Sequence, residues 1–170
     1  MQRVYVIFVA SLCLLVIACG TTNRNVKFNE GYQCPAGAKI EVPSATNATG
    51  KNFEEIDIGK ALSEELVKAL VNEGINADST AQGNKLSLPC RITEYEPGDA
   101  FKRWLWPTYG STVLDVKCEL RDIEKDKSVG TAEARHTVDA GGAYTIGAWK
   151  YIFTDLAKDI AKELKTKLSR

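Results

Sequence analysis

Hydrophobic and polar positions follow two different periods along this chain, and the two periods predict its secondary structure. Apolar residues recur every three to four positions in two stretches, which is the period of an amphipathic helix. They alternate one by one in four other stretches, which predicts strands with one covered face. The helical stretches are residues 56–73 and 149–168, and the alternating stretches are residues 39–42, 86–93, 112–120 and 129–138.

The order of these elements favours one fold class. A strand, a helix and a further strand come first, which favours a right-handed parallel crossover, and the later short connections favour antiparallel hairpins. A short edge strand is expected at residues 75–77, and a bulge or locally unpaired position is expected at Pro89, which cannot donate to a ladder. We therefore predict an α+β fold, a two-layer sandwich in which a mixed sheet of four to five strands carries two amphipathic helices on one face.

The N-terminus is apolar and has the form of an export signal. Arg3 is the only charged residue before Arg24, and residues 4–19 are almost wholly apolar. This run of 16 residues is shorter than the roughly 20 that span a bilayer as a helix, so it indicates a secretory signal peptide. Residues 16–20 (Val-Ile-Ala-Cys-Gly) resemble a bacterial lipobox, which implies cleavage before Cys19 and attachment of diacylglycerol and a further acyl chain, such as palmitate, to that residue. The alternatives are an uncleaved helical anchor and a plain signal peptide with an incidental cysteine.

The lipobox divides the chain into three expected parts. These are a lipoprotein signal peptide (1–18), a polar tether (19–37) and a single globular α+β domain (38–170). Several acyl chains anchor a protein stably where one chain would be marginal. Gly20 stands where an aspartate would resemble an inner-membrane retention signal, so we expect the anchor in the outer membrane, on its periplasmic face, with the inner membrane as the less favoured alternative.

The charge balance limits the partners of the mature protein. The chain has 22 basic and 22 acidic residues, and cleavage of the signal peptide removes only Arg3. A near-neutral domain lacks the basic stripe of a nucleic-acid-binding protein, so nucleic acid is excluded as a partner. The expected partners are the membrane, through the lipid anchor, and another protein of the cell envelope.

Three cysteines of the mature domain carry no lipid, namely Cys34, Cys90 and Cys118. Export permits disulfides, but three thiols leave one over. If the second and third strands form a hairpin, a register that places Cys90 opposite Cys118 also places Tyr95 opposite Val113. A cross-strand disulfide, a pair of buried free thiols and a bond from Cys34 to either of the other two are all consistent with this pattern.

No motif in the chain indicates catalysis. The wide cysteine spacings and the single histidine fit no metal site. His136 lies on the helix-facing side of its strand, where a hydrogen-bonded residue at the edge of the core is the simpler interpretation. Asp115, Glu119 and Glu133 alternate outward and indicate a solvated face that is balanced by basic neighbours. We therefore expect no catalytic residue, no metal and no cofactor other than the lipid on Cys19, and we do not expect an enzyme.

One segment, residues 100–111 (AFKRWLWPTYGS), concentrates aromatic and basic side chains between two strands. Three roles suit it: a lid over the end of the core, a contact with lipid headgroups, and a protein–protein patch. Alternation would place Phe101 and Leu105 on a packed side, and we expect Phe101 in particular to be buried. The residues expected to contact a partner or the membrane are Lys102, Arg103, Trp104, Trp106 and Tyr109.

Four short features occur in a fixed order: residues 92–98 (Ile-Thr-Glu-Tyr-Glu-Pro-Gly), Arg103, Gly110 and residues 140–142 (Ala-Gly-Gly). Over about residues 39–168, this pattern resembles an uncharacterised bacterial lipoprotein family, one of the domain-of-unknown-function groups. The resemblance implies an α/β architecture similar to the TolB amino-terminal domain and to the periplasmic domain of CsgG-like lipoproteins, and it carries no catalytic residues. Trp-Leu-Trp-Pro at residues 104–107 departs from the smaller, glycine-rich residues expected there.

Two functions of different classes follow from these expectations. The leading hypothesis is a non-catalytic, lipid-anchored periplasmic domain that docks on an envelope protein through its sheet face and its aromatic segment. The alternative is a carrier or sensor of a small periplasmic ligand held between that segment and the helices. An accessory subunit of a secretion or transport assembly is a third hypothesis, by analogy with the CsgG-like architecture.

Overall fold

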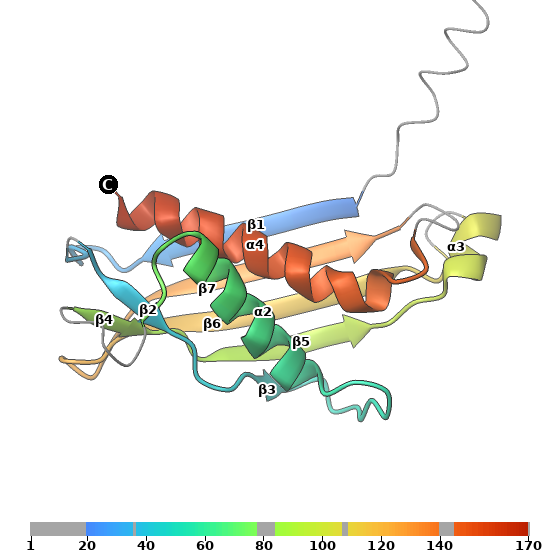
Figure 1. The fold of residues 1–170 in the computed structure, drawn as a ribbon, viewed down its shortest axis with the longest axis horizontal. Helices are drawn as coiled ribbons and strands as arrows, with labels where there is room; N and C mark the ends of the chain where they lie inside the picture. Colours follow the sequence, from blue (N-terminus) through green and yellow to red (C-terminus); the bar gives the residue numbers. More distant parts are fainter. Residues whose placement is uncertain (1–19, 36, 78–83, 107–108, 140–144, 170) are drawn as a thin grey trace, which may run out of the picture.

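The computed structural model describes residues 20–35, 37–77, 84–106, 109–139 and 145–169, so the predicted signal peptide and Cys19 lie outside the described residues. Within that part, the chain forms one seven-stranded mixed sheet accompanied by three helices (Figure 1). The strands are β1 (Gly20–Phe28), β2 (Lys39–Glu41), β3 (Thr46–Asn47), β4 (Lys85–Ser87), β5 (Cys90–Glu96), β6 (Thr112–Asp122) and β7 (Lys127–Val138). The helices are α2 (Ile58–Asn72), α3 (Ala100–Leu105) and α4 (Ala148–Leu168).

The sheet combines one parallel pair with an antiparallel group. Its main order is β1-β7-β6-β4-β2, and β5 lies between β6 and β3. β2 and β4 are parallel and are connected through α2, so the predicted strand–helix–strand unit is confirmed. The predicted strand at residues 86–93 is divided at Pro89, and its two parts, β4 and β5, pair with successive stretches of β6. The short strand expected at residues 75–77 is a single bridge from Asn76 to Ile40.

The core lies between the sheet and the helices α2 and α4, which cover the same face (Figure 1). α4 carries the apolar stripe that its period predicts, and Phe153 within that stripe is 1% exposed. Ala132 and Ala134 of β7 are buried as well, and their small side chains allow the helix to approach the sheet closely. α2 begins at Ile58, two residues after the predicted start, because the Asp57 carboxylate accepts a hydrogen bond from the Lys60 N–H at 3.0 Å and caps the helix.

The N-terminal segment corrects an expectation about the domain. We expected residues 19–37 to form a polar tether, but Gly20–Phe28 is strand β1, which pairs with β7 along its whole length. Val26 is buried in the core, and Arg24 forms a 2.6 Å ion pair with Asp159 of α4. Together with β3 and the division of the strand at Pro89, β1 raises the number of strands in the described residues above the four to five predicted. Edge strands tolerate polar and charged side chains, so the polar sequence of β1 resembles that of a linker.

Candidate functional site

α3 is a six-residue helix whose apolar side faces solvent. Asp99 begins it, because its carboxylate accepts hydrogen bonds from the N–H groups of Phe101 (2.9 Å) and Lys102 (3.1 Å). The helix and its neighbouring segments expose six large apolar side chains, each between 51% and 71% accessible. We call these residues the aromatic end: Phe101, Trp104, Leu105, Trp106, Tyr109 and Ile146. Grouped apolar exposure of this kind marks a contact surface, whereas single exposed apolar residues do not.

The side of α3 that faces the protein carries a charge instead of an apolar group. Arg103 is 3% exposed. Its guanidinium donates to the Gly110 carbonyl (2.6 Å), the Thr112 hydroxyl (2.8 Å), and both the hydroxyl (3.3 Å) and the carbonyl (2.9 Å) of Thr145. All four acceptors are neutral, and burial lowers the pKa of Arg103. One guanidinium therefore ties α3 both to β6 and to the segment before α4, a task that suits its rigid fork of donors.

Two glycines stand in tight positions of this connection, Gly98 against the Arg103 guanidinium and Gly110 against Lys102 and Asp99. Gly98 has a φ of +69° and Gly110 a φ of +84°, which are conformations that glycine adopts readily and other residues rarely. A Cβ atom on Gly98 would lie 2.5 Å from Arg103 Nη1 and 2.6 Å from Thr112 Oγ1. The connection between β5 and β6 is therefore built around the buried arginine, and the outward position of its aromatic side chains follows from that arrangement.

The helical geometry corrects three expectations for this segment. Phe101 and Leu105, which alternation places on a packed side, are 64% and 51% exposed. Arg103, which we expected to contact a partner or the membrane, is buried and holds the segment together. The reason is that a helix turns by roughly 100° per residue, so residues two positions apart do not share a side. The predicted contact residues that are exposed are Lys102, Trp104, Trp106 and Tyr109. Their contact with a partner or a membrane stays a prediction.

The aromatic end lies at the end of the sheet where β1 begins. Gly20 pairs with Val138 of β7, and Val138 pairs with Thr112 of β6. Gly20 is thus two strand spacings, roughly 10 Å, from Thr112, whose hydroxyl binds Arg103. Figure 1 shows α3 beyond this same end of the sheet. The residue that precedes Gly20 in the sequence is Cys19, the predicted lipidation site.

The sheet face opposite the helices is polar and charged, as the alternation of its strands predicts. Arg135 of β7 lies between two carboxylates, those of Glu94 at 2.5 Å and Asp115 at 3.1 Å. The hydrogen bond from Arg135 lowers the pKa of Glu94, and the bond to Glu94 raises the pKa of Arg135. Elsewhere on this face, Arg91 and Lys117 line part of a hollow of about 420 Å³. This open face therefore combines a cross-strand cluster of opposite charges at Arg135 with two like charges, Arg91 and Lys117, that lie opposite each other.

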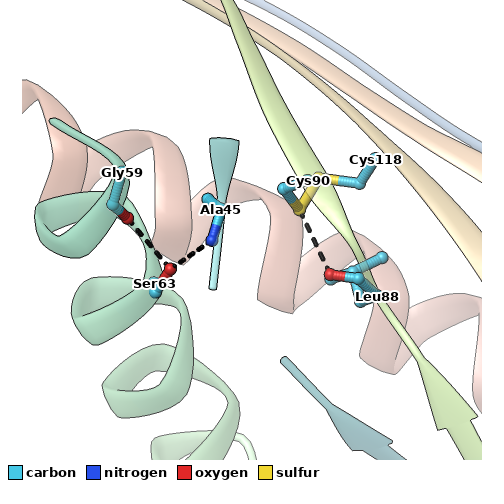
Figure 2. Close-up of a disulfide and its surroundings, with 6 residues drawn as sticks. All are labelled: Ala45, Gly59, Ser63, Leu88, Cys90 and Cys118. Atoms are coloured by element: carbon cyan, nitrogen blue, oxygen red, sulfur yellow. Dashed lines mark hydrogen bonds between the residues drawn. A yellow bond between two sulfur atoms is a disulfide. The ribbon is translucent and has the colours of Figure 1, made fainter. Parts of the chain in front are cut away.

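A disulfide joins Cys90 of β5 to Cys118 of β6, two residues that lie directly opposite each other (Figure 2). Both are 4% exposed and belong to the core. Of the three alternatives that the sequence leaves open, the structure contains the cross-strand disulfide, and Cys34 is a free cysteine. The Sγ atom of Cys90 also lies 3.5 Å from the Leu88 carbonyl oxygen (Figure 2), a contact without a shared proton because a disulfide sulfur carries none.

The register beyond the disulfide differs from the predicted one. Tyr95 is expected opposite Val113 but pairs with Leu114, because the register shifts at Thr93 and leaves this residue as a bulge in β5. Tyr95 is still only 1% exposed, and its hydroxyl donates to the Trp149 carbonyl oxygen at 2.8 Å. Burial raises the pKa of Tyr95 to about 12. The bulge thus turns this side chain back into the core beside α4.

The other side chains that the sequence singled out have structural contacts. His136 lies at the edge of the core, as predicted, and its Nδ1 atom hydrogen-bonds the Thr22 hydroxyl at 2.7 Å. Burial raises the pKa of the Cys34 thiol, which disfavours the reactive thiolate. Among the described residues, no group of three or more His, Cys, Asp or Glu side chains is placed to bind a metal. In the same part of the chain, no helix combines the length and the apolar character needed to cross a bilayer.

Comparison with known proteins identifies a family and a shared fold. A family model described as a domain of unknown function (DUF4410) matches residues 33–142. The PelC dodecamer from Paraburkholderia phytofirmans is 19% identical, with a TM-score of 0.58 over 86% of this chain and 98% of that chain. A single-residue variant of that dodecamer is 18% identical, with a TM-score of 0.52 over the same shares of the two chains. A Xanthomonas campestris protein of the DUF330 family is 10% identical, with a TM-score of 0.52 over 85% of this chain and 94% of that chain.

These comparisons confirm part of the expected resemblance. The match to a domain-of-unknown-function family confirms that expectation, while the expected likeness to TolB and to CsgG-like lipoproteins stays a prediction. No curated protein matches the sequence. At the identities given above, the solved structures show a shared fold and nothing more about this chain.

Proposed function

The chain belongs to the DUF4410 family of unknown function, and we propose that it is a lipid-anchored lipoprotein of the cell envelope that acts without catalysis, as a protein-interaction or accessory domain. The observation that carries the proposal is the start of β1 at Gly20. Lipidation of Cys19 leaves no linker between the lipid and the first strand, so the folded domain is held against the membrane surface. Gly20 itself, in place of a retention aspartate, favours the periplasmic face of the outer membrane.

The surface proposed for a protein partner is the open face of the sheet together with its β1 edge. α2 and α4 cover only the other face (Figure 1), and β1 pairs on one side, with β7. Arg135 is paired with Glu94 and Asp115 on this face, whereas Arg91 and Lys117 lie opposite each other on neighbouring strands. We therefore expect a partner to be selected by the pattern of charges and by backbone pairing at the edge, since the near-neutral chain offers no long-range attraction.

A second copy of this chain is the first partner to test. The PelC protein that shares its fold is a dodecamer. An unpaired strand edge readily pairs with another chain, and repeated head-to-tail contacts between copies close a ring when the rotation permits. The β1 edge supplies the first of these conditions.

Acyl labelling and cross-linking in cells test the two halves of this proposal. A labelled palmitate analogue should label the wild-type protein and leave a Cys19→Ala variant unlabelled, and labelling of that variant contradicts the anchor. Lys117→Glu on the open face should reduce the amount of cross-linked protein species without changing the melting temperature. The control, Lys162→Glu on the exposed side of α4, should leave the amount of cross-linked species unchanged. Loss of the species in both variants, or in neither, contradicts the assigned surface. The alternative, a carrier or sensor of a small ligand, predicts a co-purifying small molecule and no cross-linked protein.

A further inference from the structure

We propose that the aromatic end is a membrane-contact surface, which we call the seat, and that its six apolar side chains enter the headgroup layer of the membrane that holds the lipid of Cys19. This inference rests on the lipid anchor proposed above and adds an orientation to it. A lipid alone limits the distance between the domain and the bilayer, whereas a second contact also fixes how the domain stands. With the aromatic end on the membrane, the strands run away from the bilayer and the open sheet face stays free for a protein.

The position of the aromatic end relative to the predicted anchor is the first argument. Cys19 and Gly20 are consecutive, so their Cα atoms are about 3.8 Å apart. Gly20 in turn lies in the same row of the sheet as Val138 and Thr112, and the Thr112 hydroxyl binds Arg103 of α3. Each headgroup layer is roughly 5–8 Å thick, which is comparable with the length of a tryptophan side chain. The lipid therefore brings this end of the sheet, and not the opposite one, to the membrane surface.

The chemistry of the exposed side chains is the second argument. Tryptophan and tyrosine combine an apolar ring with a polar N–H or O–H group, which suits the boundary between acyl chains and headgroups. Lys102 adds a cation that is about half exposed, and its Nζ atom lies 5.7 Å from the centre of the Tyr109 ring. The acidic groups at this end include Asp99, 3.9 Å from Lys102, Glu96, which pairs with Lys51, and Asp139, which follows Val138. The local charge is thus mixed, and the seat is expected to depend on apolar insertion more than on anionic lipid.

The rigidity of α3 is the third argument. Four hydrogen bonds from the buried Arg103 hold the helix, so Phe101, Trp104 and Leu105 cannot fold back over the core without breaking them. Burying a cation costs desolvation, which these four hydrogen bonds to neutral acceptors offset, so the orientation of the helix depends on this one side chain. The arrangement keeps the apolar side outward whether or not anything covers it, and a preformed contact surface loses little conformational entropy when it binds. A protein patch would use the same residues, but the adjacent anchor favours the membrane.

The experiment uses the lipidated mature protein in vesicles of phosphatidylethanolamine and phosphatidylglycerol, some of which carry bromine on the acyl chains to quench nearby tryptophan. One variant keeps only Trp106, through Trp104→Phe and Trp149→Phe. The matched control replaces all three tryptophans by phenylalanine and adds Ile123→Trp. Ile123 is 44% exposed in the turn after β6, at the opposite end of an 11-residue strand that is roughly 35 Å long. Circular dichroism and flotation show that each variant is folded and bound to the vesicles.

The expected result is that brominated lipid removes most of the emission of the Trp106 variant and leaves that of the Ile123→Trp control unchanged. Unquenched Trp106 in protein that floats with the vesicles overturns the seat, and leaves the aromatic end to a protein partner while the lipid anchor stands. Equal quenching of both variants overturns the end-on orientation. Protein that does not float with the vesicles refutes the lipid anchor itself, and the seat with it, so the two failures are distinguishable.

Discussion

The helices α4 and α3 place the same kind of side chain in opposite environments. Phe153 of α4 is 1% exposed against the sheet, whereas Phe101 of α3 is 64% exposed. α4 offers the sheet an unbroken apolar stripe and keeps its lysines in water. α3 does the reverse, because its one buried side chain is Arg103. Burial of the charge and exposure of the rings are therefore two results of one local structure.

The difference shows that apolar exposure at the aromatic end is not left over from an incomplete core. The described residues contain no buried side-chain nitrogen or oxygen without a hydrogen-bond partner. The buried guanidinium of Arg103 donates to four acceptor atoms. Gly98 and Gly110 both adopt positive φ angles, and Gly98 leaves the space that the guanidinium occupies. A segment with this much local structure indicates a surface that is kept in shape for contact.

The largest expected effect comes from a matched pair of substitutions, one in α4 and one in α3, which tests the contrast between the two helices. Phe153→Ala should lower the free energy of unfolding by about 3–5 kcal/mol, because it leaves a cavity in a packed core. Phe101→Ala should change it by less than about 0.5 kcal/mol, because that ring is already in water. Urea unfolding followed by circular dichroism measures both values. A large loss from Phe101→Ala would return α3 to the role of a lid over the core.

The disulfide tests whether the covered side of the sheet depends on a covalent link. Replacing Cys90 and Cys118 together by alanine should cost about 3 kcal/mol, since the bond closes a loop with a sequence separation of 28. Cys34→Ala, which removes the free thiol, is the matched control and should cost less than about 1 kcal/mol. The same unfolding measurement under non-reducing conditions gives both values. An equal loss in the two cases contradicts the assigned pairing.

The arginine that holds α3 should matter more than an exposed one. Arg103→Met should lower the free energy of unfolding by about 2 kcal/mol, because it leaves buried carbonyl and hydroxyl acceptors without donors. Arg135→Met on the open sheet face should lower the free energy of unfolding by less than about 1 kcal/mol. The side chains of Arg135 and its partner Glu94 are 42% and 41% exposed, so water screens their ion pair. Thermal and urea unfolding of both variants decide the order. A smaller loss from Arg103→Met than from Arg135→Met contradicts the role given to the buried residue.

The smallest expected effect is a pH dependence on the open face. Arg135 lowers the pKa of Glu94 in the folded state, so this pair stabilises the fold at pH values above the ordinary carboxyl value of 4.5 and loses its effect as the pH falls through the lower, folded value. The few tenths of a kcal/mol by which the wild type is expected to exceed Arg135→Met at pH 7 should therefore disappear in acid. A series of urea unfolding curves from neutral pH to below 4.5 measures this difference. A difference that grows in acid has the wrong sign for the pair.

The sequence predicts the covered region well and the aromatic end poorly, for physical reasons. The stripe of α4 follows from a period that local spacing determines, and so does the alternation of β6 and β7. α3 depends on the capping carboxylate of Asp99 and on hydrogen bonds from Arg103 to Thr145, which is 42 positions away, so no local pattern reveals which side is buried. The sequence signal for this arrangement is the capping residue Asp99 followed by Arg103, between Gly98 and Gly110.

Two further differences between the predicted and the observed structure come from tertiary context. β1 is polar along most of its length because an edge strand contacts the core with few side chains, so composition alone makes it look like a tether. The predicted register at Cys90 and Cys118 is right, but the bulge at Thr93 shifts every pair beyond it by one residue. The Thr93 hydroxyl hydrogen-bonds the Asp115 side chain at 3.1 Å, a cross-strand contact that spacing does not reveal.

The orientation of the domain on a membrane tests the central claim most directly. Polarised infrared spectroscopy of the lipidated protein on a supported bilayer reports the direction of its strands through the dichroism of the amide I band. If the domain stands on its aromatic end, beside the lipid that precedes Gly20, the strands should be steeply inclined to the membrane plane. Strands that lie parallel to that plane would contradict the account, because the aromatic end would then be directed along the surface instead of into it.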